Sequence, residues 1–178
     1  MNITATETGF ATLTAPDTVR FERLLPGPIE RVWAYLTDSD LRRRWLAAGD
    51  MQAQAGTPFE LVWRNDELTD PPGTRPEGFG QEHRMQSTIT VFEPPHRLAF
   101  TWNGSGDVSI DLQPQGDEVR LTLIHRQLPD RSTMRKVGAG WHTHLDLLVA
   151  RVSGESVVEP FWDGWSQLRE AYDRRLPA

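Results

Sequence analysis

Residues 130–154, which read DRSTMRKVGAGWHTHLDLLVARVSG, decide the fold. Apolar side chains recur in this stretch at steps of three or four residues, at Met134, Val137, Trp141, Leu145, Leu148 and Val152. That spacing places them on one face of an α-helix. Gly154 follows the pattern, and glycine commonly ends a helix. The stretch therefore predicts a long amphipathic helix whose apolar face must pack against another element.

The chain before this helix alternates apolar and polar side chains, which is typical of half-buried β-strands. The pattern is found at residues 19–25, 59–63, 85–91, 98–102, 108–112 and 119–123. Short connections join the last four segments, so we expect an antiparallel meander with one buried face. The long helix is the element with the length to cover that face.

Four further segments have helical or loop character. Residues 28–36 repeat apolar side chains at helical spacing, and Pro28 suits a first helical turn. Asp38 or Ser39 can cap a second short helix. A final helix is predicted from about Pro160, whereas the Pro/Gly-rich residues 65–80 predict a long loop.

Length and composition exclude several classes of protein. The chain has 178 residues, no cysteine and a net charge of −6. We expect a flexible N-terminal segment at residues 1–17 and a single domain at residues 18–178. The lack of cysteine excludes a thiol nucleophile and Cys-ligated zinc, and it favours the cytoplasm. An acidic chain without a basic stripe is a poor nucleic-acid binder, and no apolar run is long enough for membrane insertion.

Three stretches, taken in order, resemble one family. They are residues 24–38 (LLPGPIERVWAYLTD, followed by Leu41 and Trp45-Leu46), residues 93–102 (EPPHRLAFTW), and Gly140-Trp141 with His144, Leu145 and Leu148. Together they are similar to bacterial proteins related to the Hsp90 ATPase activator, within the START-like or SRPBCC helix-grip superfamily. The similarity extends over roughly residues 19 to 175.

The resemblance implies an α+β helix-grip fold, also called START-like or Bet v 1-like. In that fold a curved antiparallel β-sheet wraps around a long C-terminal helix, and two short helices follow the first strand. It also implies a cavity between sheet and helix that takes an apolar or amphipathic molecule, such as a lipid, a polyketide or an aromatic compound. The activator itself is a eukaryotic co-chaperone with an additional N-terminal domain. We do not expect that domain here, and therefore we do not expect Hsp90 to be a partner.

The strand parity and the helical stripe indicate which side chains would form the walls of such a cavity. The predicted ligand-binding residues are Trp63, Met85, Ser87, Phe100, Trp102, His125, Trp141, His144, Leu145 and Leu148. Apolar walls would supply most of the affinity, and the polar members would orient the ligand. We expect no metal and no organic cofactor.

The histidines offer an alternative function. His125 or His144 could act as a general acid or base in an enzyme of the same fold, which makes these two the candidate catalytic residues. His142 and Asp146 lie four residues apart on the long helix, but two ligands are too few for a metal site. His83 either lines the mouth of the cavity or is exposed. The chain lacks a nucleophile elbow and a phosphate-binding loop.

A third hypothesis is an interaction protein, either chaperone-associated or part of a stress response, that acts through its surface. It requires an exposed apolar patch, for which Trp162 is the candidate. The final helix would then dock on the domain or form a homodimer. We expect Arg42, Arg43 and Arg44 to form a solvated helix face rather than an anion site.

Overall fold

A seven-stranded antiparallel sheet forms the body of the molecule in the computed structural model, which describes residues 9–102 and 106–177. The strands lie in the order β1-β2-β7-β6-β5-β4-β3. Their bounds are β1 (Thr12–Ala15), β2 (Thr18–Pro26), β3 (Pro58–Trp63), β4 (His83–Glu93), β5 (Arg97–Thr101), β6 (Asp107–Gln115) and β7 (Glu118–Arg126). The helices are α2 (Ile29–Thr37), α3 (Ser39–Arg42), the 3₁₀ turn η1 (Asn65–Glu67), α4 (Arg131–Ser153) and α5 (Phe161–Arg175).

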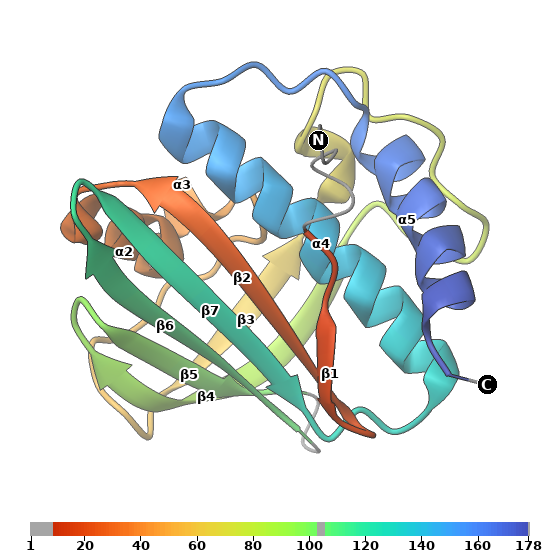
Figure 1. Cartoon of the computed structure of the whole chain (residues 1–178). Helices are drawn as coiled ribbons and strands as arrows, with labels where there is room; N and C mark the ends of the chain where they lie inside the picture. The colour runs from red at the N-terminus through yellow and green to blue at the C-terminus, as the bar shows by residue number, and fades with distance from the viewer. Residues whose placement is uncertain (1–8, 103–105, 178) are drawn as a thin grey trace.

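The long helix α4 lies across one face of the sheet, and α5 packs beside it (Figure 1). The Asp130 carboxylate caps α4 by accepting a hydrogen bond from the Thr133 N–H at 2.7 Å. Gly154 ends the helix with a φ of 71°, a left-handed conformation that glycine adopts without steric cost. Leu145 and Leu148 are completely buried against the sheet. The architecture expected from the sequence, a curved antiparallel sheet covered by a long C-terminal helix, is confirmed.

The strand alternation also holds at the level of single side chains. In β7, Val119, Leu121, Leu123 and His125 are buried, whereas the residues between them are partly exposed. His125 therefore points inward, as its parity predicts.

Before β2 the sequence pattern suggests no strand, yet β1 pairs with β2 there. Phe10 precedes β1 and packs on the rings of His142 and Tyr172, at centroid distances of 4.9 and 5.0 Å. The Ala11 N–H donates to the Tyr172 hydroxyl at 2.9 Å. Tertiary contacts of this kind order a segment whose sequence has no helical or strand periodicity. The domain boundary after residue 17 stays a prediction.

The prediction of a solvated arginine face is wrong for one of its three residues. Arg43 and Arg44 are exposed, but Arg42 is only 2% exposed. Its guanidinium donates to the carbonyls of Leu36, Thr37, Ala47 and Gly49. Arg42 therefore ties α2, α3 and the following loop together.

The prediction that Trp162 belongs to an exposed patch is also wrong. This side chain is 3% exposed, and its indole N–H donates to Asp66 at 2.7 Å. The Trp162 backbone N–H donates to the Pro72 carbonyl at 3.0 Å, so the long loop before β4 is held against α5. Among the described helices, none combines the length and apolar character needed to cross a membrane.

Candidate functional site

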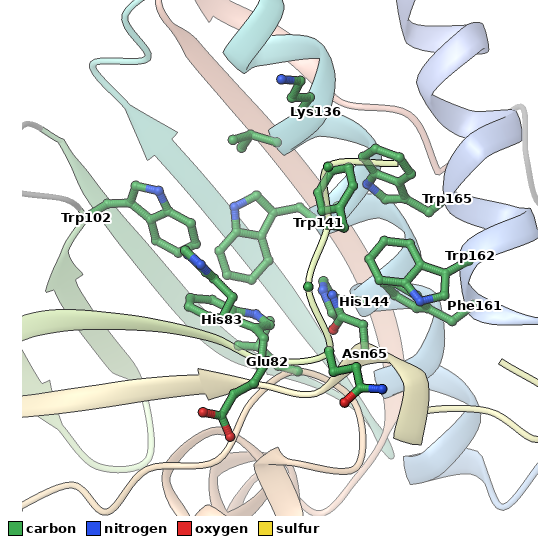
Figure 2. Close-up of a pocket in the computed structure, with 18 residues that line it drawn as sticks. Asn65, Glu82, His83, Trp102, Lys136, Trp141, His144, Phe161, Trp162 and Trp165 are labelled. Carbon is green, nitrogen blue, oxygen red and sulfur yellow. The ribbon is translucent and has the colours of Figure 1, made fainter. Parts of the chain in front are cut away.

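A pocket of about 400 Å³ opens at one end of the interface between sheet and helices. It lies between the N-terminal half of α4, the start of α5 and the edge of the sheet where β3 and β4 pair (Figure 2). The lining residues are Leu46, Trp63, Asn65, Gly78, Phe79, Gly80, Gln81, Glu82, His83, Trp102, Lys136, Val137, Gly140, Trp141, His144, Phe161, Trp162 and Trp165. Five of the seven tryptophans of the chain are among them.

Two aromatic clusters form the walls of the pocket. On the sheet side, the Trp102 ring lies 5.6 Å from Trp63 and 5.7 Å from Trp141. On the other side, Phe79 from the long loop packs on Trp162 and Trp165 of α5, at 5.4 and 5.1 Å. The Trp63–Trp102 and Phe79–Trp165 pairs are edge-to-face and the other two pairs are tilted, arrangements that aromatic rings prefer to a face-to-face sandwich.

The structure brings four of the ten predicted wall residues to this pocket, namely Trp63, Trp102, Trp141 and His144. The other six do not line it and lie buried in the core: Met85, Ser87, Phe100, His125, Leu145 and Leu148. His83 lines the mouth, is exposed, and packs its ring 5.4 Å from Trp63. The centre of the interface is thus filled by protein, and the open space lies at its edge.

His125 lies behind the wall and holds Trp141 in place. The Trp141 indole N–H donates to Nδ1 of His125 at 3.0 Å. Burial lowers the pKa of His125 to about 4, so the ring is neutral at pH 7. Because Nδ1 accepts this hydrogen bond, it carries no proton of its own.

His144 presents a different nitrogen to the pocket. Its Nδ1 lies 2.8 Å from the Trp45 carbonyl oxygen, which can only accept, so Nδ1 carries the proton and donates. Burial lowers the pKa of His144 to about 4, and the ring is therefore neutral at pH 7. Nε2 then bears a lone pair, and the hydrogen bonds found among the described residues include none to it. This lone pair is free to accept a hydrogen bond.

His142 points away from this pocket, as its helical spacing from His144 predicts. Its Nδ1 lies 3.0 Å from the Tyr172 hydroxyl, and its Nε2 lies 3.5 Å from Asp146. Burial, together with the positive charges of Arg23 and Arg175, lowers the pKa of His142 to about 3. Across residues 9–102 and 106–177, no group of three or more His, Cys, Asp or Glu side chains is placed to hold a metal ion.

Two charged side chains lie at the rim of the pocket. Glu82 bonds to Arg84 at 2.7 Å and to Arg64 at 3.0 Å, and these bonds keep its pKa below the usual value. Lys136 is exposed on α4 and forms no ion pair with any described residue. The rim therefore offers an available positive charge.

Sequence reasoning missed the wall contributed by α5 and the long loop. It places the cavity between the sheet and the long helix alone, and so it does not predict Phe79, Lys136, Phe161, Trp162 and Trp165 as wall residues. One signal was present in Gly78-Phe79-Gly80, because an aromatic residue between two glycines in a long loop can reach a neighbouring element. The contact of this loop with α5 depends on tertiary packing.

Comparison with known proteins identifies relatives of the chain. The family model described as "Activator of Hsp90 ATPase homolog 1-like protein" matches residues 26–153. A search of curated proteins finds no match.

Among solved structures, a Bordetella parapertussis protein studied by solution NMR is 41% identical, with a TM-score of 0.78 over 93% of this chain and 89% of that one. CalU16 from Micromonospora echinospora is 21% identical, with a TM-score of 0.63 over 90% and 89% of the two chains. DynU16, from the dynemicin biosynthetic locus, is 20% identical, with a TM-score of 0.60 over 82% of this chain and 49% of that one. The last two likenesses concern the fold alone.

Proposed function

Because the chain belongs to the family of Activator of Hsp90 ATPase homolog 1-like proteins, we propose that it uses the pocket between sheet, α4 and α5 to bind a small apolar or amphipathic molecule with an aromatic body. The observation that carries the proposal is the aromatic lining. Large flat side chains on opposite walls favour a flat apolar ligand. A volume of about 400 Å³ suits a molecule of two or three rings.

Gly140 supports a binding role because it leaves the floor of the pocket open. It lies in the middle of α4, where glycine is less favourable than alanine by about 1 kcal/mol. A Cβ added at this position would meet only Trp165 Nε1, at 3.9 Å, so packing does not require glycine here. Space for a ligand is a physical reason for its presence.

The two candidate catalytic histidines fit binding better than catalysis. A general base is most effective when its pKa lies near the working pH. Burial lowers the pKa of both His125 and His144 to about 4, and the Nδ1 acceptor of His125 is already used by Trp141. We therefore assign His144 the role of a hydrogen-bond acceptor and His125 that of a support for Trp141.

The location of DynU16 in a biosynthetic locus supports the inclusion of biosynthetic aromatic compounds in a ligand screen. The family model takes its name from an activator of the Hsp90 ATPase. We do not propose from this name that the chain activates Hsp90.

A thermal-shift screen followed by isothermal titration calorimetry tests the proposal. We expect two- and three-ring aromatics to raise the Tm, since a ligand that binds only the folded state stabilises it. Gly140→Leu should fill the pocket and weaken binding at least tenfold, whereas Ser132→Leu, exposed on the same helix, should bind as the wild type does. If no aromatic compound stabilises the protein, or if Gly140→Leu binds as well as the wild type, the proposal fails.

A further inference from the structure

One stripe of α4 runs along the floor of the pocket. Lys136, Gly140 and His144 are spaced four residues apart and all line it. Residues at this spacing lie above one another on the same helix face. With a rise of 1.5 Å per residue, the eight steps from Lys136 to His144 correspond to about 12 Å. The floor thus has a polar group at each end, Lys136 and His144 (Figure 2). Gly140 lies between them in the sequence and adds no side chain to the floor.

The inner end of the stripe accepts a hydrogen bond and cannot donate one. The Trp45 carbonyl fixes the proton of His144 on Nδ1, so Nε2 presents only its lone pair. A ligand group next to Nε2 must therefore supply the proton. Hydroxyl groups meet this requirement, whereas ethers and carboxylates would leave Nε2 without a partner.

The outer end of the stripe favours a negative charge. Lys136 forms no ion pair within the described part of the chain, and the Glu82 carboxylate, which lies elsewhere on the rim, is bonded to Arg64 and Arg84. An anionic group at the rim would pair with Lys136 without having to displace an existing partner. Its contribution would be modest, because the site is exposed to water.

Resting on the proposed function, we infer that the pocket selects an elongated planar aromatic carboxylate with a hydroxyl at its far end. The hydroxyl donates to Nε2 of His144, and the carboxylate pairs with Lys136. The rings lie over Gly140, between Trp141 on one side and the Phe79, Trp162 and Trp165 cluster on the other. The inference names both the chemical class of the ligand and its orientation.

Four naphthalene probes separate these contributions in the wild-type protein by calorimetry. 6-Hydroxy-2-naphthoic acid carries both the hydroxyl and the carboxylate. 6-Methoxy-2-naphthoic acid keeps the oxygen at position 6 but has no proton to donate, and 2-naphthoic acid has no oxygen at position 6. 2-Naphthol has the hydroxyl but no carboxylate. We expect the first to bind about tenfold more tightly than either acid without a hydroxyl, which is the effect of one buried hydrogen bond. It should bind about threefold more tightly than 2-naphthol at low salt, and this difference should shrink as salt is added.

Four variants, two at each position, locate the recognising groups. His144→Asn retains a donor for the Trp45 carbonyl but removes the Nε2 acceptor, so the hydroxyl preference should disappear. His144→Gln, which extends an amide oxygen toward the pocket, should restore part of it. Lys136→Met should abolish the preference for the acid over 2-naphthol, and Lys136→Arg should keep it.

The outcomes distinguish this inference from the proposed function on which it rests. If no probe binds the wild type, the proposed function fails. If all four bind with equal affinity, the pocket is an aromatic binding site but the inference is wrong. The inference is also overturned if His144→Asn folds, as judged by circular dichroism, and still prefers the hydroxyl compound.

Discussion

Three of the five histidines are buried, and each has a ring nitrogen at hydrogen-bond distance from a fixed partner. Trp141 donates to His125, the Tyr172 hydroxyl faces His142, and His144 donates to the Trp45 carbonyl. All three rings are neutral at pH 7 because burial lowers each pKa. Their shared role in the folded state is to accept or donate one hydrogen bond without carrying charge.

These histidines predict a loss of stability in mild acid. In the unfolded chain histidine binds a proton below pH 6.5, whereas in the folded protein the pKa values of His125, His142 and His144 are about 4, 3 and 4. Protons therefore favour the unfolded state as the pH falls from 6.5 towards 4. Each histidine should lower the free energy of unfolding by about 2 kcal/mol between pH 7 and pH 5. Urea denaturation at the two pH values measures this loss.

A pair of variants shows whether the buried histidine rings cause this loss of stability in acid. His144→Asn cannot titrate in this range and should lose about 2 kcal/mol less than the wild type between the same pH values. His96→Gln, at an exposed turn, should lose as much as the wild type. Equal acid losses in all three proteins would contradict the explanation.

Arg42 carries the second prediction at this scale. Arg42→Met removes the donor that serves four carbonyls, and the hydrogen bonds to two of them, Leu36 and Ala47, are buried, so we expect a loss of about 3 kcal/mol or more in the free energy of unfolding. Arg43→Met, at the exposed neighbouring position, should stay within about 0.5 kcal/mol of the wild type. Similar stabilities of the two variants in urea denaturation would show that the carbonyl contacts contribute little.

At the scale of elements, periodicity predicts helices and strands where one face is buried and the other is wet. The bounds of α4 and the inward side of β7 follow from it, because their patterns are long and regular. Periodicity does not predict strand β1, because this segment becomes a strand only through pairing with β2. The burial of Arg42 is equally invisible, since three consecutive arginines look alike in sequence and only the folded backbone presents carbonyls to one of them.

The two glycines in the first half of α4 predict opposite responses to alanine. At Gly140 a Cβ meets only Trp165 Nε1 at 3.9 Å, so Gly140→Ala should stabilise the protein by up to about 1 kcal/mol through helix propensity. At Gly138 a Cβ would lie 3.2 Å from two atoms of the Tyr172 ring, so Gly138→Ala must displace that ring by a few tenths of an ångström and should destabilise the protein. Urea denaturation of both variants tests the difference. If both variants were more stable than the wild type, the Tyr172 ring would accommodate the added methyl group without loss of stability.

Across the whole molecule, the interface between sheet and α4 is solid at its centre and hollow at one end. The sequence indicates which side chains face inward, and four predicted residues do reach the pocket. It does not indicate whether inward side chains fill the space between them, because that depends on how closely the layers approach. Leu145 and Leu148 fill the centre, whereas the open end depends on α5 and on residues 78–82 of the loop.

This arrangement predicts where a bound ligand slows hydrogen exchange. With 6-hydroxy-2-naphthoic acid at saturation, amides of residues 78–83 and 161–165 should exchange more slowly at short times, because the ligand contacts both and opposes their local opening. The turn between β1 and β2 lies at the opposite edge of the sheet, and its exchange at the same times should not change. Gly140→Leu with the same compound should show no protection of the loop. If protection appeared instead at Leu147, Ala150, Val157 and Val158, the ligand would occupy a second pocket between α4 and α5, which these residues help to line, rather than the aromatic pocket.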